Sequence, residues 1–280
     1  MYSRDILKSS RREFSRRKTK LLVIKLIIGL FIIVLLAALL SWGSRNEKSL
    51  IKGVKIEGNE TISAEEVLKI TEKKISGKYI FLFPKNNIFI YPGGAIAEEI
   101  LDNMKKVKTV ETKIGDGNIL LVKVYERKPS YIWCPGQLPP ENTISDNQCY
   151  FLDEQGLSFS EAPRFSGPVF FEIYASSTVG NEFIGKYPFE GGLFKKLTLF
   201  KDALLQINIP ATGLIRMNDG DFKFVLKTGG AVLINEKNDI NISLRNIVSA
   251  KKALEDGGKN ISLIEYIDLR FGNKVFFKFK

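Results

Sequence analysis

Three short motifs in the sequence carry the residue types of an acyl-serine enzyme. Enzymes of that class use S-x-x-K, S-D-N and K-T-G in this order, and the first serine attacks the acyl carbon. The chain contains Ser49-Leu50-Ile51-Lys52, Ser145-Asp146-Asn147 and Lys227-Thr228-Gly229, in the same order. The chemistry would be acyl transfer through a serine ester.

The surroundings of these motifs argue against acyl transfer. The nucleophilic serine should open a buried helix, whereas Ser49 leads into a predicted strand. Ser145 lies in a loop rich in proline and asparagine, and Lys227-Thr228-Gly229 runs into a second glycine, which is typical of a hairpin turn. S-x-x-K also recurs at residues 15–18 and 249–252. We therefore expect no catalytic residues, and the acyl-serine enzyme is the least favoured alternative.

Residue types that bind metals are scarce. The sequence has no histidine, which removes the commonest general base and the commonest zinc ligand. Its two cysteines, Cys134 and Cys149, are too few for a four-thiolate site and do not form a C-x-x-C pair. The sequence therefore predicts no metal site and no cofactor.

The two cysteines are instead candidates for a disulfide. Cys134 and Cys149 flank a 14-residue loop, at the end of one predicted strand and at the start of the next. Outside the cytoplasm this arrangement favours a disulfide, which in the chain-entropy picture would add about 3 kcal/mol of stability. The alternative is a pair of free thiols.

The positive charge of the chain is concentrated at its N-terminal end. Residues 1–25 hold nine Lys/Arg and two acidic residues, whereas the other 255 residues hold 33 basic and 29 acidic ones, within a total net charge of +11. A basic face that follows a phosphate backbone is therefore not expected, and we predict neither a nucleic acid nor a small-molecule substrate as partner.

Residues 21–42, LLVIKLIIGLFIIVLLAALLSW, form a predicted transmembrane helix. Only Lys25 and Ser41 interrupt the apolar run, and 22 residues suffice for a hydrocarbon core of ~30 Å. The basic tail at residues 1–20 places the N-terminus in the cytoplasm and the bulk of the chain outside it. A cleaved signal peptide is the alternative, but the apolar core is long for one. The tail sets this topology or, alternatively, contacts lipid or a cytoplasmic partner.

The rest of the chain predicts an α+β protein in two domains. Residues 48–127 read as β-α-α-β-β: a strand at Val54–Glu57, a helix with Ser63 as N-cap and Glu66 completing a capping box, a helix at Ala95–Val107, and a hairpin. The hairpin strands are Lys108–Ile114 and Ile119–Glu126.

Residues 128–280 predict a mainly antiparallel β domain with packed helices. The expected strands are Tyr131–Cys134, Cys149–Asp153, Leu157–Glu161, Val169–Tyr174, Gly213–Asn218, Phe222–Lys227, Ala231–Asn235, Leu263–Arg270 and Lys274–Lys280. Helices are expected at about 189–207 and 240–255. Asp268 and Arg270 share one face of their strand, and we expect them to form a structural ion pair or turn anchor rather than a partner contact.

The last predicted strand is the best candidate for a binding site. Val275, Phe277 and Phe279 share a face that fits the domain core, while Lys274, Phe276, Lys278 and Lys280 share the other. Lysine guards a sheet edge against uncontrolled pairing, and the pattern also suits the addition of a partner strand with complementary acidic residues. The alternative is an interior strand with ordinary solvent-facing lysines.

The order of these parts resembles the FtsQ/DivIB family of bacterial cell-division proteins. Four stretches carry the likeness: "VKIEGNETISAEEVLKI", "VKTVETKIGDGNILLVKVYERKPSYIW", "CYFLDEQGLSF" and "EYIDLRFGNKVFFK". They are similar to the opening and closing segments of the family's POTRA domain and to the first and last hairpins of its β domain. One departure is the loop "FLFPKNNIFIYP", which is bulkier than the family pattern.

The resemblance implies a non-enzymatic scaffold of the divisome in the cytoplasmic (inner) membrane at the division septum. Such a protein would bind the FtsB/FtsL-type proteins and link them to septal peptidoglycan synthesis. In the family, the last strands of the β domain pair with FtsB, which places the partner site at residues 274–279. The runner-up is another POTRA-bearing assembly or translocation protein, and an acyl-serine peptidoglycan enzyme comes third.

Overall fold

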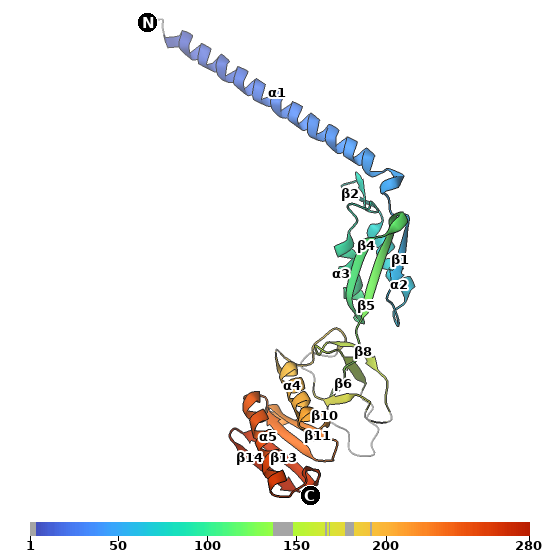
Figure 1. Ribbon diagram of the computed structural model, residues 1–280. Coiled ribbons are helices and arrows are strands. Elements are labelled where there is room, and N and C mark those ends of the chain that lie inside the picture. Colours follow the sequence, from blue (N-terminus) through green and yellow to red (C-terminus); the bar gives the residue numbers. More distant parts are fainter. Residues whose placement is uncertain (1–3, 137–147, 166, 168, 177–181, 191) are drawn as a thin grey trace. The chain divides into compact units, whose positions relative to one another are not determined.

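The computed structural model describes residues 4–136, 148–165, 167, 169–176, 182–190 and 192–280 (Figure 1). The chain divides into two compact units. The first comprises residues 1–103 and 109–125, and the second residues 104–108 and 126–280.

The first unit begins with a long helix, α1 (Arg4–Ser44). Its segment Thr19–Ser44 is 26 residues long, has a mean hydropathy of 3.1, and is long and apolar enough to cross a membrane. Its leucine and isoleucine side chains are largely exposed. An isolated helix with an apolar surface on every side is typical of a segment that lies in lipid. A single turn of 3-10 helix, η1 (Glu47–Ser49), follows it.

The folded part of the first unit is a three-stranded sheet with two helices. Its elements are β1 (Gly53–Glu57), α2 (Ala64–Ile75), β2 (Lys78–Tyr79), β3 (Phe83–Pro84), α3 (Gly93–Asn103), β4 (Val107–Ile114), η2 (Asp116–Asn118) and β5 (Ile119–Glu126). The strand order is β1-β5-β4, and β1 pairs with β5 in parallel, while β2 and β3 form a small separate hairpin. Sequence alone did not predict this small hairpin.

Capping and packing explain the two helices of this sheet. The Ser63 hydroxyl accepts the Glu66 backbone N–H at 3.4 Å, which confirms Ser63 as the N-cap of α2. Ile96 and Ile100 of α3 are fully buried, together with Leu120 and Val122 of β5. The helix expected at 95–107 was too long, because Val107 is the first residue of β4 and is itself buried.

The second unit is built on a mixed sheet that has nine strands in the described part of the chain, in the order β14-β13-β12-β11-β10-β9-β6-β7-β8. The strands are β6 (Tyr131–Cys134), β7 (Cys149–Leu152), β8 (Ser158–Ala162), β9 (Phe171–Tyr174), β10 (Ala211–Arg216), β11 (Asp221–Leu226), β12 (Ala231–Asn235), β13 (Ile264–Phe271) and β14 (Lys274–Phe279). The short 3-10 turns η3 (Asn218–Gly220) and η4 (Ile261–Leu263) precede β11 and β13.

The expectation of a mainly antiparallel sheet needs one refinement. The pairs β6–β9, β9–β10 and β12–β13 are parallel, whereas the other described pairs of this sheet are antiparallel. Parallel neighbours require a crossover, and the crossovers β9–β10 and β12–β13 hold α4 (Leu193–Gln206) and α5 (Ile240–Asp256).

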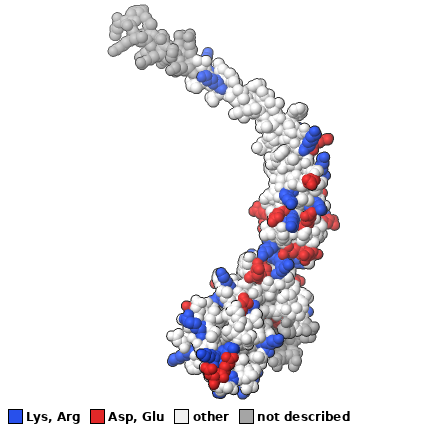
Figure 2. Space-filling model, in the orientation of Figure 1, with Lys and Arg blue, Asp and Glu red and all other residues white. Residues whose placement is uncertain are grey.

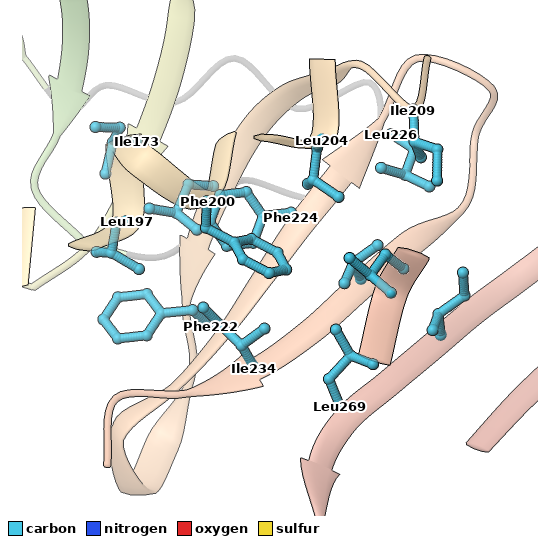
Figure 3. Close-up of a cluster of buried hydrophobic side chains, with 14 of the residues drawn as sticks. Ile173, Leu197, Phe200, Leu204, Ile209, Phe222, Phe224, Leu226, Ile234 and Leu269 are labelled. Atoms are coloured by element: carbon cyan, nitrogen blue, oxygen red, sulfur yellow. The ribbon is translucent and has the colours of Figure 1, made fainter. Parts of the chain in front are cut away.

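The two helices bury one face of the sheet. Leu197, Phe200 and Leu204 of α4 point toward Phe222 and Phe224 of β11 in the core shown in Figure 3. Phe200 and both β11 phenylalanines are completely buried, and each contributes roughly 1.5–3 kcal/mol through removal from water. This core sets the internal face of the strands that contribute to it, which include β11, β12 and β13.

A disulfide joins the ends of β6 and β7. The Cα atoms of Cys134 and Cys149 lie 4.3 Å apart and their sulfur atoms are bonded. Cys134 is buried, with 4% exposure, and Cys149 is partly exposed. It closes the segment that contains residues 137–147, which lie outside the described residues.

We predict that loss of this disulfide lowers the free energy of unfolding of the second unit by about 3 kcal/mol, because it releases a loop of this length in the unfolded chain. Urea unfolding of the oxidised protein and of a Cys134→Ser/Cys149→Ser variant measures the difference. Reductant should shift the midpoint of the oxidised protein and leave that of the variant unchanged. Equal alkylation of both cysteines in native, unreduced protein would contradict the bond.

Candidate functional site

The strand predicted to bind a partner lies at the edge of the large sheet. β14 pairs with β13 on one side, and no described strand pairs with its other side. In Figure 1 it lies at the outer end of the orange and red strands. A tight turn with Gly272 at φ 63° connects the two strands, and glycine adopts this conformation without strain.

Alternate residues of β14 direct their backbone N–H and C=O groups toward the open edge of the sheet. The Lys280 N–H donates to the Leu263 carbonyl at 2.9 Å, and Lys274 pairs with Phe271 at the turn. In an antiparallel pair, N–H and C=O groups of successive residues point to opposite edges. The even-numbered residues therefore face β13, and Val275, Phe277 and Phe279 direct their backbone groups toward the open edge.

The side chains of β14 divide differently from the predicted core stripe. Val275 and Phe279 pack against the core cluster, as expected. Phe277 is 44% exposed, so its assignment to the core was wrong. An edge strand has a neighbouring strand on one side only, which leaves this ring with Phe279 as its aromatic contact, at 5.6 Å between centroids.

The opposite face of the strand also displays an aromatic surface. Phe276 is 50% exposed and meets Phe271 edge to face, with 5.4 Å between the ring centroids. The predicted strand ended at Arg270, so sequence reasoning left Phe271 out of the hairpin strands and missed its part in this pair. The signal that could have found it is the hairpin register, which places Phe271 and Phe276 close together across the turn.

The lysines of the strand are exposed and only partly neutralised. The Lys278 ammonium lies 2.7 Å from a Glu265 carboxylate oxygen, and this hydrogen bond raises the pKa of Lys278. Lys280 donates to the carbonyls of Thr228 and Ser262, at 3.1 and 3.2 Å. Figure 2 shows basic and acidic side chains interspersed over the described residues of the face it draws, without a large field of one sign.

An ion-pair network anchors β13 behind the edge strand. The Arg270 guanidinium binds both carboxylate oxygens of Asp268, at 2.9 and 2.6 Å, and an oxygen of Asp221 at 2.5 Å. Asn235 donates to the other Asp221 oxygen at 2.6 Å. Asp268 is 5% exposed, and the two carboxylates raise the pKa of Arg270 well above its usual range. The expected structural ion pair is present, and it also includes Asp221 of β11.

A shallow hollow of about 340 Å³ lies beside β9 and β10, and sequence reasoning did not find it. Glu172, Tyr174, Gly213 and Ile215 are among its lining residues. The Tyr174 hydroxyl donates to Glu172 at 2.9 Å, and burial together with this carboxylate raises the pKa of Tyr174 to about 12. A phenol that stays protonated in this way acts as a hydrogen-bond donor and not as a base.

Acyl-serine chemistry requires a nucleophilic serine at the start of a buried helix, and Ser49 and the K-T-G motif lie in short turns instead. Ser49 ends the single turn η1, and Lys227-Thr228-Gly229 occupies the turn between β11 and β12. Ser145-Asp146-Asn147 lies outside the described residues. Among the residues that are described, no three His, Cys, Asp or Glu side chains gather in a way that could hold a metal ion.

The fold and the edge strand define a class of protein: a mixed α+β chain with one N-terminal apolar helix and a large sheet that ends in an exposed, aromatic strand. Comparison with protein-family models and with curated proteins finds no match for this chain.

We predict that Arg270→Met destabilises the second unit by about 2 kcal/mol, because the buried Asp268 carboxylate loses its partner. Lys278→Met, which breaks only the exposed pair with Glu265, should leave the unfolding midpoint unchanged. The chain has two tryptophans, so in a Trp42→Phe background the fluorescence of buried Trp133 reports this unit alone during urea unfolding. Equal midpoints for the two variants would contradict a structural role for the network.

Proposed function

We propose that this protein is a membrane-anchored scaffold of the bacterial division machinery, similar to the FtsQ/DivIB family. α1 crosses the cytoplasmic membrane with the N-terminus inside, and both folded units lie outside the cytoplasm at the division septum. The protein binds FtsB/FtsL-type partners and links them to septal peptidoglycan synthesis, without catalysing a reaction itself. The exposed edge of β14 is the single observation that carries this proposal.

The first unit supports the family assignment through its topology. Apart from the small hairpin β2–β3, its order is one strand, two helices and two strands. Its sheet has the order β1-β5-β4, with β1 at one edge, and this fits the β-α-α-β-β arrangement of a POTRA domain. The 26-residue apolar segment of α1 supports the anchor, because it exceeds the ~20 residues that a bilayer core requires.

The edge strand supports binding by strand addition. An incoming strand would hydrogen-bond to the outward backbone groups of Val275, Phe277 and Phe279, which extends the sheet by one strand. Its side chains would cover the exposed rings of Phe276 and Phe277, one on each face. Aromatic side chains of this kind dominate binding energies at interfaces.

The charges at the edge favour an acidic partner segment. Lys274 and Lys278 lie on the same face as Phe276, and Lys274 has no ion pair among the described residues. An extended segment with an apolar side chain flanked by carboxylates would match this order of cation, ring and cation. Electrostatic complementarity of this kind mainly selects the partner and accelerates its association.

We predict that Phe277→Pro weakens partner binding at least about fivefold more than Phe277→Ala does. Both variants lose the ring, but only proline removes the outward N–H, and one such hydrogen bond contributes about 1 kcal/mol. Pull-down titration of the full-length variants with the FtsB/FtsL pair of the same organism measures the difference. Proline is tolerated here because the lost N–H does not pair with β13.

Equal binding by the proline and alanine variants, with both still folded, would exclude strand addition at this edge. Leu199→Asp is the matched surface control, because Leu199 of α4 is 51% exposed, close to the 50% of Phe276. Phe276→Asp should reduce binding, and Leu199→Asp should leave it unchanged.

We also predict that a fluorescent fusion to the N-terminus of the full chain concentrates at midcell in dividing cells. The enrichment should appear with the start of constriction and should be absent from cells whose division is blocked before partner assembly. A uniform membrane signal in constricting cells would count against the division role as a whole.

A further inference from the structure

The hairpin β2–β3 of the first unit has an unusual turn. The Leu82 N–H donates to the Tyr79 carbonyl at 2.9 Å, and the two residues between them, Ile80 and Phe81, have φ values of 48° and 61°. Positive φ at both central positions selects asparagine and glycine. A β-branched and an aromatic residue are strained in this conformation, so the turn sequence is poor for folding.

The same two residues are among the most exposed apolar side chains of the folded units. Ile80 is 81% exposed and Phe81 is 92% exposed. A second turn after β3 adds Phe89, which is 79% exposed. Large apolar side chains displayed at the tips of turns gain nothing from packing inside the protein, which indicates that their contacts lie outside it.

Hydrogen bonds hold this hairpin against the end of the apolar helix. The Ser41 hydroxyl donates to the Leu82 carbonyl at 2.9 Å, and Asn87 donates to the Ser44 carbonyl at 2.8 Å. Ser41 and Asn87 are 5% and 3% exposed, so both contacts are shielded. In Figure 1, β2 lies beside the C-terminal end of α1.

This attachment fixes the depth of the turn relative to a bilayer. Ser41 lies inside the 26-residue apolar segment, which is about 39 Å long at 1.5 Å per residue. A hydrocarbon core of ~30 Å covers only part of that length, so Ser41 falls at the interface between hydrocarbon and headgroups. Trp42, which is 80% exposed, belongs to the residue type that prefers this level.

The residues around the turn fit a lipid surface. The Arg45 guanidinium donates to the Leu82 carbonyl at 3.4 Å, Lys78 is exposed in β2, and Lys85 lies 5.5 Å from the centre of the Tyr79 ring. Apolar rings with a basic rim bind at the level of anionic headgroups.

We propose that Ile80 and Phe81, together with Phe89, insert into the outer surface of the membrane and dock the first unit on the lipid. The occupant of this patch is the bilayer that α1 spans, so the inference rests on the proposed membrane anchor. The docking turn would fix the orientation of the unit at the membrane. A flexible link after α1 alone would leave that orientation free to change.

A fluorescent probe at position 81 tests this docking in the full chain. Phe81→Cys is labelled with an environment-sensitive dye, in protein reconstituted into vesicles of phosphatidylcholine and phosphatidylglycerol. We expect emission at shorter wavelength and quenching by spin-labelled lipid. The matched control is a probe at Glu65, an exposed residue of α2 with a 74% exposed side chain, which should report water and remain unquenched.

A second variant separates docking from folding. Ile80→Asn/Phe81→Gly gives the turn the residues that its conformation selects, so its thermal midpoint should equal or exceed that of the original protein. A probe at position 89 should lose most of its quenching in this variant. Unchanged quenching at position 89 would show that the turn does not dock the unit and would overturn the proposal.

The outcomes distinguish the docking from the anchor. If the chain resists carbonate extraction from the vesicles while the probe at position 81 behaves like the probe at Glu65, the docking is wrong and the anchor stands. If the chain is extracted by carbonate, the anchor is wrong and the docking falls with it. Quenching at position 81 in an extraction-resistant chain supports both.

Discussion

A sheet that does not close into a barrel has to end in strands with one open edge, and the second unit is arranged around this constraint. The helices α4 and α5 cover one face of its large sheet. Both this cover and the strand pairing end at β14 in the described part of the chain. The residues of β14 must satisfy two demands at once. Val275 and Phe279 complete the core, while the backbone between them stays accessible. The exposed rings and lysines follow from this position.

The open edge is useful only if the strand behind it is held rigidly. β13 carries a register irregularity next to Asp268, at the place where the chain approaches the turn. The Asp268–Arg270–Asp221 network spans β13 and β11 at this level, on the sheet face away from the helices. A guanidinium shared by two carboxylates is directional and strong, because it forms several charge-assisted hydrogen bonds at once. It therefore supports the hairpin on the face opposite the core that α4 and α5 cover in the described part of the chain.

Features with a local cause could be predicted from the sequence, and features that depend on distant partners could not. The N-cap at Ser63, the last hairpin and the pairing of Asp268 with Arg270 follow from spacing within a few residues. The parallel pairing of β12 with β13 depends on the packing of α5, which lies between them in the chain. The exposure of Phe277 depends on β14 lying at the edge, and period-2 alternation contains no information about strand order. Alternation alone assigned this ring to the core.

The turn at Ile80 and Phe81 is another feature that the local sequence does not predict. The loop was recognisable as bulky and apolar, but its conformation and its attachment to Ser41 emerge only from the fold. Local stability favours a covered sheet edge and an Asn-Gly turn. The chain instead has an open edge at β14 in one unit and an Ile80-Phe81 turn in the other. Such departures persist where another interaction compensates for them. At β14 the compensating interaction would be a partner strand, and at the β2–β3 turn it would be lipid. The two surfaces differ accordingly: backbone groups are presented at the edge, whereas only side chains are presented at the turn.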